Sequence, residues 1–176
     1  MSDRTPISWP SAEPGLVDRE RRAMAEHAPD MQWRDDLVWR SRPMVGWEGR
    51  VPAWGGDRTQ PPGVEELLAG RRLELRVFYP EAFPAVPAIL EPVEPDVPLE
   101  RRTLNQWHVN GDGSLCLMQA ADDWNLTDRA ADLVRKASGW FIEYLLVDGG
   151  KIERMTQRGV LVDTSLDARL AEYAPS

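Results

Sequence analysis

The sequence predicts a single α+β domain, because strand-like patterns fill much of its first half and a long helical pattern lies in its second half. Its 176 residues, of which 42% are hydrophobic, suit one compact domain with a buried core. Residues 73–77 alternate between apolar and charged side chains, which is the period of a strand with one buried face. Residues 127–147 instead place apolar side chains three and four positions apart, the spacing of an amphipathic helix.

The N-terminal region is expected to divide into a tail and a helix. Residues 1–15 contain three prolines and a glycine among polar residues, so we expect a flexible tail there. Residues 16–28 show near-helical spacing with a thin apolar face, and Pro29 closes the segment. The single domain is therefore expected to span residues 16–176, with its last part forming a C-terminal helical extension.

Further short strands are expected on either side of the alternating strand. Trp33 and residues 37–40 begin a β-rich stretch, which continues through residues 44–54 with glycine and proline between its parts. The prolines that follow Tyr79 lack N–H donors, so they allow only edge strands or extended segments there. Residues 88–90 are the predicted short strand in that passage.

The long helix has clear start and stop signals. Thr127 is the expected N-cap, and Gly149 and Gly150 are the expected stop. Shorter helices are predicted at residues 151–157 and 166–173. The apolar face of the long helix is predicted to pack into the core and consists of Leu133, Ala137, Trp140, Phe141, Tyr144 and Leu145.

Composition excludes several classes of function. With 29 acidic and 21 basic residues the net charge is −8, so the chain has no general attraction to nucleic acid or anionic membranes. The longest nearly apolar run, residues 140–147, is far shorter than the roughly 20 residues that span a bilayer. One cysteine and two histidines make a structural zinc site improbable, and no cofactor is expected. Without an apolar signal core or paired cysteines, the protein is expected to be cytoplasmic.

Residues 100–126 form the segment where chemistry is expected. They lack helical and strand periodicity but contain two glycines and many polar groups, the composition of an ordered functional loop. This loop carries Cys116, the only cysteine of the chain. A lone cysteine is more often a small buried hydrophobe than a catalytic thiol, so its neighbours must decide between the two interpretations.

Those neighbours resemble the central part of the ubiquitin-conjugating enzyme family. Tyr79-Pro80, followed by Phe83-Pro84 and Pro87, resembles the proline-rich passage after the family's third strand. The resemblance covers roughly residues 37–147. Trp107-His108-Val109-Asn110 is similar to the family's aromatic-His-Pro-Asn signature, and Gly113-Ser114-Leu115-Cys116-Leu117 is similar to the segment around its catalytic thiol. Trp124 stands eight residues after the cysteine, which is the family's usual spacing.

Two departures from the family pattern are present. Val109 replaces the usual proline, and the interval from Asn110 to Cys116 is about two residues shorter than in eukaryotic members. Residues 140–145 look more like prokaryotic relatives, which occur with antiviral signalling systems and ubiquitin-like operons.

The resemblance implies a fold and a reaction. The fold would have an N-terminal helix, a four-stranded antiparallel meander, an active-site loop and C-terminal helices. Cys116 would carry the C-terminus of a ubiquitin-like protein, or of a nucleotidyltransferase, as a thioester. An activating-enzyme-like protein would load it, and an amine would accept the acyl group.

Other residues of the loop have two interpretations each. Asn110 is either a donor to the oxyanion that forms during acyl transfer or a residue that hydrogen-bonds within the adjacent turn. Asp122 and Asp123 either orient or deprotonate an incoming lysine or are solvated loop carboxylates. His108 is expected to fix the loop, and Trp124 to anchor it to the core.

Two other functions compete with the conjugating enzyme. A non-catalytic module of the same fold would only bind a ubiquitin-like protein. Such variants usually lack the cysteine, whereas this chain has it inside the matching motif. A cysteine hydrolase is disfavoured, because His27 lies in the predicted N-terminal helix and His108 has no evident orienting partner.

Overall fold

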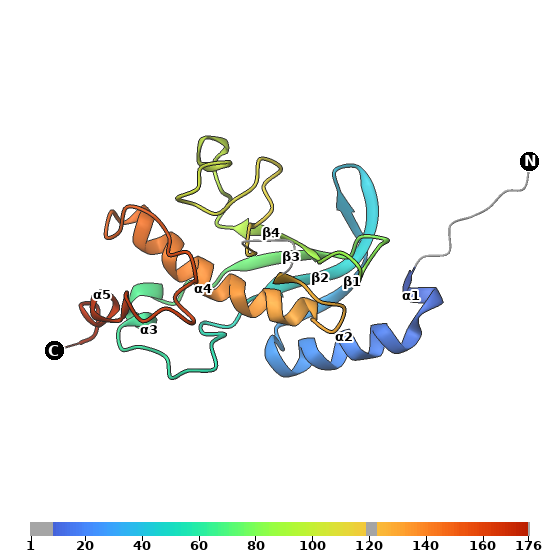
Figure 1. The fold of residues 1–176 in the computed structure, drawn as a ribbon, viewed down its shortest axis with the longest axis horizontal. Helices are drawn as coiled ribbons and strands as arrows, with labels where there is room; N and C mark the ends of the chain where they lie inside the picture. Colours follow the sequence, from blue (N-terminus) through green and yellow to red (C-terminus); the bar gives the residue numbers. More distant parts are fainter. Residues whose placement is uncertain (1–8, 119–122, 176) are drawn as a thin grey trace, which may run out of the picture.

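The computed structural model describes residues 9–118 and 123–175 and has an α+β architecture (Figure 1). Its sheet contains four strands in the order β1-β2-β3-β4, and every neighbouring pair is antiparallel. The expected N-terminal helix, antiparallel meander and C-terminal helices are thereby confirmed. The elements are α1 (Trp9–Ala12), α2 (Pro14–His27), β1 (Met31–Trp39), β2 (Arg42–Arg50), α3 (Val64–Leu68), β3 (Glu74–Phe78), β4 (Ile89–Glu94), the 3-10 helix η1 (Leu99–Arg101), α4 (Ala130–Asp148) and α5 (Asp167–Ala171).

The main core lies between one face of the sheet and α4. Leu73, Leu75 and Val77 point into this core and are almost fully buried, as their alternation with Glu74 and Arg76 predicts. All six residues of the predicted apolar face of α4 are buried as well. In Figure 1, α4 crosses the sheet, while α2 lies beside the N-terminal half of α4.

The outer face of the sheet is divided into a charged part and an apolar part. A row of ion pairs crosses the strands, with Glu48 at its centre: Arg76 lies 2.7 Å from its carboxylate and Arg34 lies 2.9 Å from it. At the other end of the strands, Trp39 packs on Phe78 with ring centroids 5.0 Å apart, and Leu37 completes this cluster.

The predicted flexible tail is wrong for residues 9–15. Trp9 begins the short helix α1 and is buried against Tyr79, with ring centroids 5.1 Å apart. Pro14 occupies the first turn of α2, where a missing N–H costs nothing because that group has no partner within a helix. Prolines that suggest irregular structure therefore start helices here.

Helix boundaries also differ from the predictions in the C-terminal half. The long helix starts at Ala130 and not near Thr127, because the Asp128 carboxylate accepts the N–H of Asn125 and closes a turn before the helix. No helix forms over residues 151–157, and the last helix is shorter than residues 166–173. Helix α3 lies in a segment for which no element was predicted.

Within the described residues, no helix has the length and apolar character needed to cross a bilayer.

Candidate functional site

Cys116 lies at the end of a small hairpin that β4 holds in place. Val109 and Leu115 form the bridge of this hairpin, and both side chains are buried in the core. The N–H of Leu115 donates to the carbonyl of Leu90 at 2.8 Å, which attaches the hairpin to β4. The N–H of Cys116 donates to the carbonyl of His108 at 2.8 Å, so the backbone at Cys116 is fixed while its side chain is exposed.

The tip of the hairpin is a turn held by side chains. The N–H of Gly113, a residue with φ of 91°, donates to the carbonyl of Asn110. The Asn110 amide donates to the Ser114 hydroxyl at 3.0 Å, and that hydroxyl donates to Asp112 at 2.6 Å. Burial acts to raise the pKa of Asp112, but hydrogen bonds from Ser114 lower it overall. Asn110 thus takes part in the turn, as one of its two interpretations states.

His108 is half-buried and adopts a positive φ of 48°. Burial lowers the pKa of its imidazole, because the charged form is disfavoured away from water. Across residues 9–118 and 123–175, no hydrogen bond joins this imidazole to a carboxylate. Its backbone carbonyl, by contrast, binds the N–H of Cys116. These contacts describe a residue that shapes the loop.

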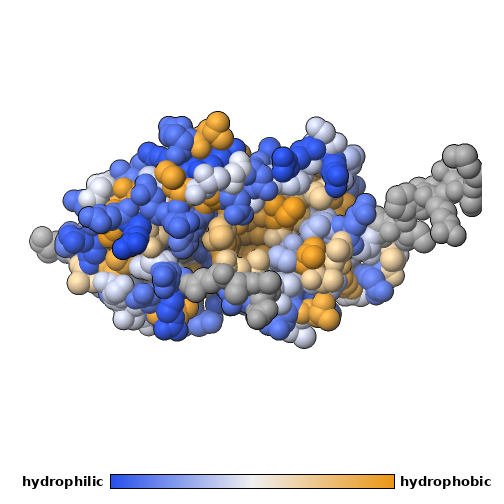
Figure 2. All heavy atoms as spheres, turned by 45° about the horizontal axis from the view of Figure 1, so that its top comes forward, coloured by the Kyte–Doolittle hydropathy of each residue, from blue (hydrophilic) through white to orange (hydrophobic). Residues whose placement is uncertain are grey.

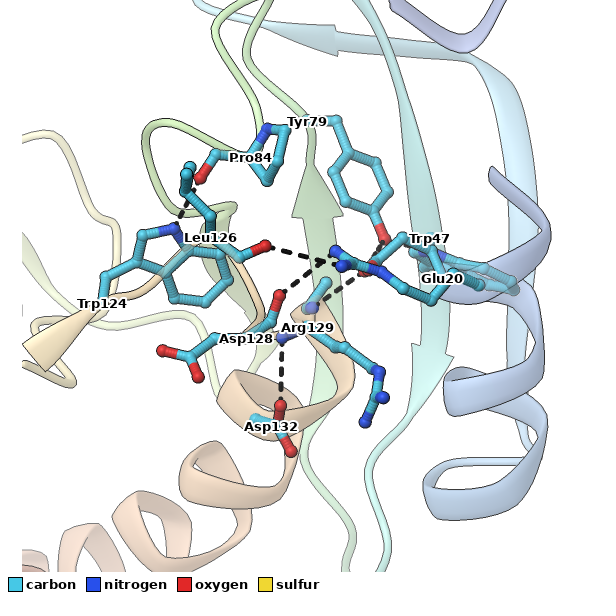
Figure 3. A network of polar contacts seen from close by, with 11 residues as sticks. Glu20, Trp47, Tyr79, Pro84, Trp124, Leu126, Asp128, Arg129 and Asp132 are labelled. Carbon is cyan, nitrogen blue, oxygen red and sulfur yellow. Dashed lines mark hydrogen bonds and ion pairs between the residues drawn. The ribbon is translucent and has the colours of Figure 1, made fainter. Parts of the chain in front are cut away.

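Trp124 anchors the segment that follows Cys116. Its indole N–H donates to the carbonyl of Pro84 at 2.8 Å (Figure 3). Its ring centroid lies 6.1 Å from that of Phe83. The proline-rich passage and the segment after the cysteine are therefore joined. Asp123 is exposed. Asp122 lies outside the described residues.

A buried carboxylate that sequence reasoning missed holds the next part of this segment. Glu20, on α2, is 1% exposed and accepts hydrogen bonds from the Tyr79 hydroxyl at 3.0 Å and from the N–H of Ala130 at 2.9 Å. The Trp47 indole donates to the same hydroxyl at 3.0 Å. Arg19 donates to the backbone carbonyls of Leu126 and Asp128, just before α4. The sequence did contain a signal for this buried carboxylate, because Glu20 stands three positions from Val17 and from Ala23 and therefore lies on the buried face of α2.

The Cys116 thiol is exposed at the surface of the described part of the chain. A cavity of about 350 Å³ is present elsewhere, between α4 and the ends of the strands, and none of its lining residues belongs to the hairpin. Figure 2 turns the top of Figure 1 forward and shows apolar and charged side chains interspersed, with an apolar hollow near the centre. Leu99 and Leu104, in the segment before the hairpin, are among the exposed large apolar residues. Among the described residues, no group of three or more acidic, His or Cys side chains is placed to hold a metal ion.

Comparison with known proteins adds no further constraint. No family model, curated protein or solved structure matches this chain. The function is therefore argued from the residues and their geometry.

Proposed function

We propose that the protein is a ubiquitin-conjugating-type acyl carrier that holds the C-terminus of a ubiquitin-like protein as a thioester on Cys116. The observation that carries this proposal is an exposed thiol on a backbone fixed by the His108 and Leu90 carbonyls. An exposed nucleophile on a surface suits a macromolecular acyl donor, which cannot enter a closed pocket. The residues that resemble the family surround this same thiol.

Loading would be an exchange between two thioesters. The Cys116 thiolate attacks the thioester carbonyl on the activating protein, the new C–S bond forms, and the donor's sulfur leaves as thiolate. Because one thioester replaces another, the step is close to isoenergetic. A small thiolate fraction at neutral pH is sufficient for a positioned thiol, so a histidine base is not required. The neutral, half-buried His108 is consistent with such a site.

Discharge would transfer the acyl group to an amine. The amine attacks the Cys116 thioester, an amide bond forms, the C–S bond breaks, and the amine's excess proton passes to solvent or to a nearby base. Asp122 and Asp123 are proposed to orient or deprotonate this amine. Negative charge develops on the carbonyl oxygen, and an amide N–H lowers its energy. Asn110 donates one N–H to Ser114, and we propose its second N–H for the oxyanion.

The proposed partners are an activating-enzyme-like protein and the C-terminus of a ubiquitin-like protein or of a nucleotidyltransferase. A cytoplasmic bacterial antiviral or ubiquitin-like pathway is the proposed setting. The net charge of −8 favours protein partners over nucleic acid.

Charging in vitro tests the proposal. The protein is incubated with its activating partner, ATP and the modifier, and a thiol-sensitive adduct is expected on Cys116. Cys116→Ala should abolish this adduct, and Cys116→Ser should give an ester that thiols release more slowly. Since the chain has one cysteine, Cys116→Ala with Ser165→Cys moves the only thiol to another exposed position and serves as a matched control. An equal adduct on the relocated thiol would show that the hairpin has no special role.

The second candidate, a non-catalytic module, is favoured by the hydrogen bond that engages Asn110 in the turn. It predicts that the modifier binds equally to the wild type and to Cys116→Ala, and that neither forms an adduct.

A further inference from the structure

Glu143 is a buried carboxylate in the middle of α4, where a charged group needs partners. It is 2% exposed and accepts three hydrogen bonds from the segment after the helix. The N–H and the hydroxyl of Thr156 donate at 2.5 and 2.8 Å, and the N–H of Val160 donates at 2.6 Å. These N–H groups therefore do not form the helix predicted at residues 151–157. The segment of residues 151–163 is instead fixed on α4 (Figure 1).

The same segment contacts the chain just before the nucleophile hairpin. Met155 is 5% exposed, and its N–H donates to the carbonyl of Gln106 at 3.2 Å. Gln106 precedes Trp107, whose carbonyl accepts the indole N–H of Trp140 at 2.9 Å. Trp140 and Glu143 are three positions apart and thus lie on one side of α4. Helix α4 and residues 151–163 together hold the turn that leads into the hairpin.

Arg101 closes the other side of Trp107. Its guanidinium lies 4.3 Å from the centre of the Trp107 ring, 2.7 Å from Asp148 and 2.9 Å from the Tyr144 hydroxyl. His108 follows Trp107, and its carbonyl accepts the N–H of Cys116. The packing around Trp107 is therefore linked to the backbone of Cys116 through one neighbouring residue and one hydrogen bond.

We propose that Glu143 is a positioning residue, which fixes residues 151–163 against Gln106 and thereby sets the backbone geometry at Cys116. The kinetic part of this inference rests on the proposed function, whereas the structural coupling does not. The C-terminal segment, which lies outside the resemblance, would then be part of the machinery for acyl transfer. Misplacement of a reacting group by about 1 Å can slow a reaction by roughly 100-fold, so such a residue can matter at a distance.

Glu143→Gln tests the coupling, because it keeps the side chain's shape but turns one acceptor oxygen into a donor that faces the Thr156 N–H. Glu172→Gln is the matched control. It makes the same chemical change in the same C-terminal region, where the exposed Glu172 pairs with Arg169 at 3.2 Å, outside residues 151–163. The first measurement is amide hydrogen exchange at Met155 and Cys116, with Leu75 of the central sheet as the reference for global opening. Thr156→Val, with Thr156→Ser as its rescue, replaces Glu143→Gln if that variant does not fold.

The coupling is supported if Glu143→Gln speeds exchange at both Met155 and Cys116 by at least about tenfold while exchange at Leu75 is unchanged, and if Glu172→Gln changes exchange at neither Met155 nor Cys116. Faster exchange at Met155 with an unchanged Cys116 would overturn it. In single-turnover assays, Glu143→Gln should slow discharge by at least about tenfold, and Thr156→Ser should transfer normally. If exchange at Cys116 responds but the wild type never becomes charged, the coupling stands and the proposed function fails.

Discussion

Glu20→Gln is expected to destabilise the protein far more than a typical change on a helix surface. In the structure, the carboxylate of Glu20 accepts hydrogen bonds from Tyr79 and from the N–H of Ala130 in a site with almost no water contact. Both donors reach the same carboxylate oxygen, and the other oxygen accepts the Arg19 guanidinium at 3.3 Å. The NH₂ group of a glutamine would therefore face either Arg19 or the two other donors, and the charge that pairs with Arg19 is lost in both orientations. Loss of a hydrogen bond to a charged group costs about 1.5–3 kcal/mol, and an unsatisfied buried donor adds to this, so we expect about 3 kcal/mol. For a chain of this length, each kcal/mol lowers Tm by about 2–4 °C, which corresponds to a decrease of roughly 6–12 °C.

Urea unfolding of the wild type and Glu20→Gln measures this difference in the free energy of unfolding. Glu26→Gln is the matched control, because Glu26 is exposed on the same helix and its replacement should change stability by no more than about 0.5 kcal/mol. Tyr79→Phe removes one of the three donors to Glu20, and its effect should not add fully to that of Glu20→Gln. If Glu20→Gln were no more harmful than Glu26→Gln, the argument for a network that joins α2, the sheet and α4 would be refuted.

Two further predictions concern the hairpin of residues 109–115 and its neighbour His108. Asn110→Ala should slow discharge of the pre-charged protein about 100-fold relative to Ser114→Ala in single-turnover assays. Both variants lose the hydrogen bond within the turn, but only Asn110→Ala loses the proposed donor to the oxyanion. Equal discharge rates would assign Asn110 to the turn alone. The lowered pKa of the His108 imidazole means that this side chain binds a proton more readily in the unfolded chain than in the folded protein, so the free energy of unfolding should decrease as pH falls below about 6.5. Urea unfolding at pH 7.5 and 5.5 measures this decrease, which should be smaller in His108→Gln. An unchanged decrease in that variant would contradict the lowered pKa of His108.

The parts of the fold that the sequence predicted are those where one periodic pattern determines burial. The alternation of Leu73, Leu75 and Val77 identified β3 because one face of that strand meets α4. The apolar face of α4 was evident for the same reason. Helix α3 was missed because five residues between the left-handed residues Gly63 and Ala69 are too few to show a period.

The remaining differences have their origin in contacts between distant parts of the chain. Residues 156 and 160 donate hydrogen bonds to Glu143, and the N–H of Ala130 at the start of α4 donates to Glu20, 110 positions earlier. Neither pairing leaves a local pattern. At the candidate site, the sequence singled out Cys116 and Asn110, but it did not indicate that the Asn110 amide binds the Ser114 hydroxyl within the turn.

The row of charges on the outer face also determines how the strands align. In the observed register, Arg50 faces Glu74 and Glu48 faces Arg76. A slip of β3 by two residues would keep every apolar side chain on its original face, so burial alone discriminates weakly against it. Such a slip would place Glu48 opposite Glu74 in one direction, or Arg50 opposite Arg76 in the other. Like charges directly opposite each other are destabilising, so these solvent-facing residues help to select one alignment among those that the buried face accepts.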